Sequence, residues 1–249
     1  MTKLVRHNYS RARDKTGRWL LLGLVVIMAG AAYLAYRYYG DTAGRSGQVL
    51  AWLREPAEHA EWAVQAGQRC AGAPFILPTS GLVGYLWDDS FRPGHRHQGI
   101  DIFGGGQVNE TPVVAAFAGY LTRLPEWKSS VIIRIPEDPL DPNRQIWTYY
   151  THMAGPDGDS TILADYPPGT SEVYVEEGAL LGYQGNYSGT PGSPVGVHLH
   201  FSIVLDDGNG KFLNELEIDN TLDPSAYFGL PLNARINQDQ IPICEGTAS

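Results

Sequence analysis

Five residues in three short segments have the types and spacing that metal-assisted hydrolysis needs. His97 and Asp101 lie four residues apart in HQGID, His198 and His200 lie two apart in HLH, and His152 ends TYYTH. Imidazole nitrogens and carboxylate oxygens are common zinc ligands, and a catalytic zinc keeps one coordination position open. Imidazole also titrates near neutral pH, so a histidine that binds no metal can act as a general acid or base.

The first two segments are typical of strands that carry polar residues on one face. Alternate side chains of an extended chain share a face, so His97, Gly99 and Asp101 point the same way, and Gly99 leaves the space between the other two empty. His198 and His200 also share a face, roughly 6–7 Å apart along the strand. The apolar residues between these positions face the opposite way, towards a core. The pattern leaves open which of the two histidines binds the metal.

Each segment alone also has an ordinary structural explanation. A histidine pair is often found at a surface, or in a core where other groups satisfy its nitrogens, and an HxxxD spacing is common. A helical arrangement, as in HExxH motifs, is disfavoured by Gly99 and the IDIF run after it. His152 lies at a predicted strand end before a long loop, 155–169, where functional residues are frequent. Together, the three segments favour a metal site.

Short β-rich runs separated by Gly, Pro and Asp turns position these residues. The chain has 249 residues, enough for one large domain or two small ones. From residue 70 onward the pattern predicts a mainly β, antiparallel domain without a sustained helix. The expected strands are 99–103, 112–116, 119–124, 131–135, 145–152, 173–175 and 198–205.

The first 36 residues predict a membrane anchor. Residues 1–18 form a basic tail with six basic residues and one acidic residue, and residues 19–36 carry no charge. An uncharged run of this length is just above the lower limit of about 17 residues for a transmembrane helix. The positive-inside rule then places the N-terminus in the cytoplasm and the rest of a single-pass protein outside it, at the cell membrane. The alternative is a secreted protein whose signal peptide is cleaved at the Ala-Gly-Ala of residues 29–31.

Residues 37–69 are interpreted as a stalk, with a turn-prone stretch at 40–47 and two short helices, before a domain at 70–249. Cys70 and Cys244, the only cysteines, bracket this domain. Outside the cytoplasm they predict a disulfide, with two buried free thiols as the alternative. The whole chain has a net charge of −9, so residues 19–249 carry −14. This acidic character argues against nucleic-acid binding, which depends on neutralising phosphates.

In this order, HQGID, THM and VHLHFSI resemble the M23 family of zinc metallopeptidases, the lysostaphin and LytM type. PVVAAFAG, which ends at Gly119, and GALLGYQG, which begins at Gly178, support the resemblance. It covers about residues 80–205. It implies an antiparallel β-sheet domain with a substrate groove, a Zn²⁺ ion bound by His97, Asp101 and His200, and catalytic roles for His152 and His198.

The resemblance also implies a function, an endopeptidase that cuts peptide cross-links of bacterial peptidoglycan. Two alternatives stay open, a non-catalytic scaffold or activator of other wall enzymes, and a peptidase that acts on exported proteins. The sequence indicates a peptidoglycan peptide and the membrane as partners, and no particular protein partner. No role is expected for His95 beyond that of a solvated loop residue. Candidates for the groove walls are Trp87, Tyr149, Tyr150 and Tyr187.

Overall fold

The computed structural model describes residues 15–90, 94–237 and 240–244. Internal contacts divide the chain into two units, Met1–Asp41 and Thr42–Ser249. Helix α1, Lys15–Arg54, begins in the first unit and ends in the second.

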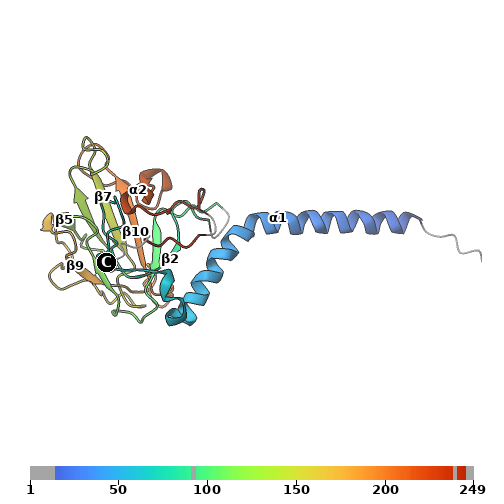
Figure 1. The fold of residues 1–249 in the computed structure, drawn as a ribbon, viewed down its shortest axis with the longest axis horizontal. Coiled ribbons are helices and arrows are strands. Elements are labelled where there is room, and N and C mark those ends of the chain that lie inside the picture. Colours follow the sequence, from blue (N-terminus) through green and yellow to red (C-terminus); the bar gives the residue numbers. More distant parts are fainter. Residues whose placement is uncertain (1–14, 91–93, 238–239, 245–249) are drawn as a thin grey trace, which may run out of the picture. The chain divides into compact units, whose positions relative to one another are not determined.

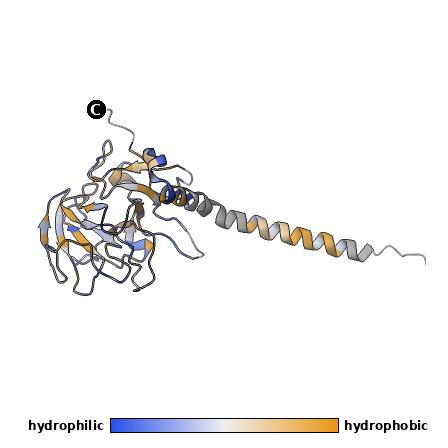
Figure 2. Cartoon of the chain, turned by 90° about the horizontal axis from the view of Figure 1, so that it is seen from below, coloured by the Kyte–Doolittle hydropathy of each residue, from blue (hydrophilic) through white to orange (hydrophobic). Residues whose placement is uncertain are grey.

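In the first unit, the side chains of α1 from Trp19 to Leu34 are exposed and mostly apolar (Figure 2). Within the described part of the chain, no helix is both long enough and apolar enough to cross a membrane. Residues 19–36, the predicted anchor, form part of α1. Residues 1–14 of the predicted basic tail lie outside the described residues.

The turn expected at 40–47 is wrong, because α1 runs through it. Glycine weakens a helix by only about 1 kcal/mol, and packing can outweigh that cost. Here Val49 and Trp52 are buried against the β-sheet, which stabilises the end of the helix. The two short stalk helices are replaced by the end of α1 and a 3₁₀ segment, η1, Pro56–Trp62.

The second unit is built on one large antiparallel sheet (Figure 1). Its strand order is β1-β2-β3-β10-β7-β6-β5-β8, and β11 also pairs with β10. In that order the strands are Ala63–Val64, Gly81–Tyr85, Ile100–Phe103, Leu199–Leu205, Ile146–Thr151, Val131–Ile135, Gly119–Thr122 and Val173–Val175, with β11 at Thr221–Leu222. A small second sheet pairs β4, Pro112–Val114, with β9, Leu180–Tyr183. Short helices η2, Ile218–Asn220, and α2, Ser225–Phe228, lie near the end of the chain.

The prediction of a mainly antiparallel β domain is confirmed, and each of the seven expected strands is present with ends shifted by at most two residues. Four strands were not expected, β1, β2, β9 and β11. β2 and β9 read GLVGY and LLGY, and glycine and leucine are weak strand signals.

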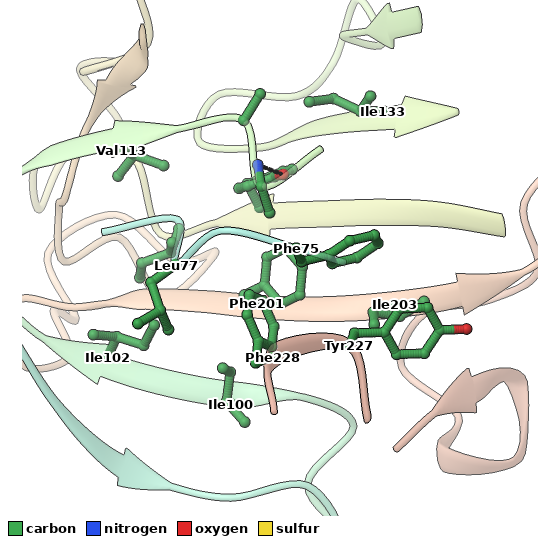
Figure 3. Close-up of a cluster of buried hydrophobic side chains, with 14 of the residues drawn as sticks. Phe75, Leu77, Ile100, Ile102, Val113, Ile133, Phe201, Ile203, Tyr227 and Phe228 are labelled. Atoms are coloured by element: carbon green, nitrogen blue, oxygen red, sulfur yellow. Dashed lines mark hydrogen bonds between the residues drawn. The ribbon is translucent and has the colours of Figure 1, made fainter. Parts of the chain in front are cut away.

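The core lies on one face of the central strands, as the alternation predicts. Ile100 and Ile102 of β3 pack there with Phe201 and Ile203 of β10, and α2 adds Phe228 (Figure 3). Fully burying an aliphatic or aromatic side chain of this size stabilises the fold by about 1.5–3 kcal/mol. The residues between them therefore face the other side of the sheet, where the candidate site lies.

The predicted disulfide is present. Cys70 and Cys244 are bonded, with their Cα atoms 5.2 Å apart and a sequence separation of 174. It joins the beginning of the β-rich domain to its end.

Candidate metal centre

Two neighbouring strands bring the candidate ligands together. β3 and β10 pair so that Asp101 lies directly opposite His200. Directly opposite residues in an antiparallel pair have Cβ atoms about 5 Å apart on one face. His97 lies three residues before β3, and its ring contacts Asp101, as the alternation predicts. Within the described residues, these three form the cluster that could hold a metal ion.

The three candidate ligand atoms are nearly equidistant. His97 Nε2 lies 3.1 Å from Asp101 Oδ1 and 3.0 Å from His200 Nδ1, and His200 Nδ1 lies 2.9 Å from Asp101 Oδ1. Tetrahedral coordination at about 2.0–2.1 Å separates ligand atoms by roughly 3.3 Å. A small outward movement of the side chains would therefore fit a zinc ion, and three protein ligands leave a fourth position open.

The backbone fixes the orientation of the first of these ligands. His97 is buried, and its Nδ1 lies 2.9 Å from the Leu86 carbonyl oxygen. Because a carbonyl only accepts, Nδ1 carries the proton and Nε2 presents its lone pair to the site. The backbone of His97 also exchanges hydrogen bonds of 2.8 Å with Asp88 and Asp89. Residues 86–89 therefore hold both the ring and the backbone of His97 in place.

The other two histidines lie beside this cluster, and in both of them, as in His97, the ring Nδ1 donates to a backbone carbonyl. His152 Nδ1 donates to the Tyr187 carbonyl at 2.6 Å, and His198 Nδ1 donates to the Gly196 carbonyl at 2.7 Å. In each ring, Nε2 is therefore free to accept a proton. The two ring centroids are 4.4 Å apart, and His198 Nε2 lies 3.7 Å from Asp101 Oδ1.

Burial and charge set the ionisation of this cluster. Burial opposes a charge on His97, but the neighbouring Asp101 raises the pKa of this imidazole, whereas the other three groups shift towards the forms that a metal site uses. Burial alone would raise the pKa of Asp101, but the neighbouring His97 and His198 hold it well below its usual value. Burial lowers the pKa of His198 and of His200 to about 4, against the opposing effect of Asp101. At neutral pH these two imidazoles are uncharged, and an uncharged imidazole is the form that binds metal or accepts a proton.

His152 reaches its position through an unusual backbone conformation. Its φ is 69°, in the left-handed region that residues with a Cβ seldom adopt. It immediately follows the last residue of β7, so the chain turns sharply there. Gly185 packs against this turn, and a Cβ at that position would lie 2.4 Å from the His152 carbonyl oxygen. The close approach explains why the position beside the turn carries glycine.

A cavity of about 700 Å³ surrounds the cluster, and all five residues predicted from the sequence line it. Tyr149 and Tyr187 also line it, as proposed for the groove walls. Tyr150 is instead fully buried in the core, where its hydroxyl accepts a hydrogen bond from the Ala116 amide. Trp87 does not line the cavity; its indole donates to Thr221 Oγ1. His95 lies in a loop, as expected, but it is half-buried and lines the cavity.

Several cavity residues had no signal in the sequence. Val49 and Leu53 come from the end of α1, which looked like a stalk, and Glu215 and Leu216 come from a loop after β10. Gln98, between the two ligands of the first motif, donates to the Leu216 carbonyl at 2.7 Å and holds that loop beside the site. Only the tertiary packing brings these segments to the cavity.

Neither a protein-family model nor a curated protein matches this sequence. Among solved structures, lysostaphin from Staphylococcus simulans is similar, with 19% identity over 60% of this chain and 49% of that one and a TM-score of 0.39. A putative M23 peptidase from Pseudomonas aeruginosa has 21% identity over 71% of this chain and 60% of that one, with a TM-score of 0.37. A putative glycyl-glycine endopeptidase, LytM, from Ruminococcus gnavus has 22% identity over 59% of each chain, with a TM-score of 0.35. The chain thus spans about half the length of lysostaphin, and at these identities and TM-scores the likenesses establish no function.

Proposed function

We propose that this protein is a zinc metalloendopeptidase that cleaves peptide cross-links of bacterial peptidoglycan outside the cytoplasm. The observation that carries the proposal is the geometry of the metal centre. Three ligand atoms from His97, Asp101 and His200 lie about 3 Å apart, and two further imidazoles stand beside them. A purely structural cluster would not need two extra histidines whose Nε2 atoms are left as acceptors.

A zinc ion held by these ligands would supply Lewis acidity, which polarises a scissile carbonyl and acidifies water. His152 and His198 supply the proton transfers. Because backbone carbonyls hold each Nδ1–H, either Nε2 can take the proton of the attacking water. The resulting imidazolium can then stabilise the developing oxyanion or protonate the departing amine.

The disulfide supports a location outside the cytoplasm, because such bonds persist in oxidising compartments and are rare in the cytosol. The substrate class comes from the resemblance of the HQGID, THM and VHLHFSI motifs. The cavity of about 700 Å³ is large enough to hold a segment of such a peptide.

Incubation of the full-length, zinc-loaded protein with isolated peptidoglycan tests the proposal. We expect cross-linked dimers to disappear and new free amines to appear, with fragment masses that identify the cut bond. A chelator-treated sample is the control. If zinc is bound and no product forms, the proposed activity is wrong. Capture of a wall hydrolase by the same protein would then favour a scaffold, and cleavage of exported proteins alone would favour the general peptidase.

The roles of the five residues are separable. Alanine variants of His97, Asp101 and His200 should each weaken zinc binding by more than about 100-fold, because each removes a ligand. The His152→Ala and His198→Ala variants should retain zinc and lose about 100-fold or more of the activity. Zinc content by atomic absorption and cleavage by mass spectrometry measure the two effects. Equal zinc loss in all five variants would contradict the assignment.

A further inference from the structure

The end of α1 packs on the face of the sheet that carries the metal ligands. Asp101 and Phe103 alternate on β3 and so share that face. Trp52 Nε1 donates to the Phe103 carbonyl at 2.7 Å, and Val49 and Trp52 are buried against Leu82 and Phe103. The helix therefore covers this face of β2 and β3 beyond the ligands.

The strand register shows where along the cavity the helix lies. Tyr85 of β2 is paired with Asp101, Asp101 with His200, and His200 with Thr151. These residues form a row across four adjacent strands. Ser46 of α1 lies 3.1 Å from the Tyr85 hydroxyl, so the helix stands at the β2 end of the row.

The two ends of the row have different chemistry. At the β2 end, Val49, Leu53, Phe103 and Val195 line the cavity, and we call these four residues the apolar corner. The Phe103 ring connects the α1 residues of the corner with Val195. It packs with Val49 on one side, and on the other it lies close to Gly196, the residue after Val195, where an added Cβ would be 3.5 Å from the ring.

The opposite end, beside β6 and β7, carries hydroxyl groups and a carboxylate. Ser130 Oγ lies 2.9 Å from the Tyr149 hydroxyl and 2.7 Å from Thr151 Oγ1, and Glu215 lines the same cavity. A peptide that crosses the row would therefore meet apolar side chains at one end and polar groups at the other.

The apolar corner is close to the reacting centre. The Phe103 and His198 rings stack with centroids 4.9 Å apart and an interplanar angle of 24°. Adjacent strands are about 4.8 Å apart, and an extended peptide advances about 3.4 Å per residue. Phe103 lies two residues along β3 from Asp101, about 7 Å, so the corner lies about two substrate residues from the scissile bond.

We propose that the apolar corner is a specificity subsite that takes an apolar side chain of the peptide substrate and sets the direction in which the peptide binds. This inference rests on the proposed peptidase function. It makes Leu53 a specificity-determining residue from a segment that lies outside the HQGID, THM and VHLHFSI motifs.

Two matched substitutions on α1 test the subsite. Leu53 is 38% exposed and lines the cavity, whereas Leu50 is 52% exposed on the same helix and does not. Because both side chains are partly exposed, Leu53→Ser and Leu50→Ser should both fold, and their melting temperatures verify this. The probes are pentaglycine and five pentaglycine analogues with one leucine at each position in turn. Calorimetry on full-length, chelator-treated protein measures their affinities without turnover.

One of the five leucine analogues should bind at least about tenfold more tightly than pentaglycine, because burial of a leucine side chain contributes that much. The Leu53→Ser variant should lose about fivefold of this preference and keep its affinity for pentaglycine, whereas Leu50→Ser should change neither. Absence of a preferred leucine position, or equal losses in both variants, would overturn the inference. If the preference is present but zinc-loaded protein cuts no peptidoglycan, the proposed function fails and the subsite stands.

Discussion

Replacement of His152 by glycine should leave the protein more stable than replacement by alanine, the reverse of the usual order. Both variants lose the ring and its hydrogen bond to the Tyr187 carbonyl, so that cost cancels in the comparison. With φ at 69°, a residue with a Cβ carries a cost of about 1–2 kcal/mol that glycine does not. Glycine loses about 0.4–1 kcal/mol through the greater freedom of the unfolded chain. The central values of the two ranges differ by about 0.8 kcal/mol in favour of glycine.

Calorimetry of the zinc-free variants at one protein concentration measures this difference. For a folded unit of this size, it corresponds to a melting temperature about 1–4 °C higher for His152→Gly. Thr151, the preceding residue, lies in β7 and has no positive φ, so Thr151→Gly should be less stable than Thr151→Ala. If alanine at position 152 is as stable as glycine or more so, His152 does not adopt the left-handed conformation, and the explanation of how its ring reaches His198 is refuted.

Three further outcomes are expected. In Gly99→Ala the new Cβ would lie 2.1 Å from the Phe201 carbonyl oxygen, so β3 and β10 must separate. The free energy of unfolding, measured in urea, should fall by about 3 kcal/mol, and zinc binding should weaken. Burial raises the pKa of Tyr150 to about 12. Between pH 10 and 12 the unfolded chain has therefore lost a proton from this group that the folded protein keeps, so the group should lower stability by up to about 3 kcal/mol as the pH rises. Tyr150→Phe should remove this share of the decline and leave the share of Tyr227, whose pKa burial also raises. Loss of the Cys70–Cys244 disulfide should cost about 2–5 kcal/mol, and a Cys70→Ser variant whose urea midpoint is unchanged would contradict this.

Alternation along single strands was sufficient to predict the faces of the candidate site. It placed His97 and Asp101 together, gave His198 and His200 one face, and assigned their apolar neighbours to the core, because side-chain direction in a strand has a period of two. It could not show that Asp101 lies opposite His200, because register depends on which strands pair. The geometry that favours His200 over His198 as a ligand follows from that register.

The role of the end of α1 could not be predicted from the sequence. Val49, Trp52 and Leu53 have the composition of any amphipathic helix, and nothing local distinguishes a stalk from a cavity wall. Their positions depend on contacts with β2 and β3, which lie 30 to 50 residues further along the chain. Strand β2 escaped prediction for a related reason, since two glycines in five residues weaken its local signal and pairing with β3 compensates.

The disulfide makes residues 70–244 a covalent ring. A single backbone cut anywhere inside the ring, for example in the exposed stretch at 188–196, would leave the two pieces joined through Cys70 and Cys244. Such a nicked protein would still run as one 27.3 kDa band on a non-reducing gel and would separate only after reduction. An intact band therefore does not demonstrate an intact backbone, and digestion experiments on this protein should be read under reducing conditions.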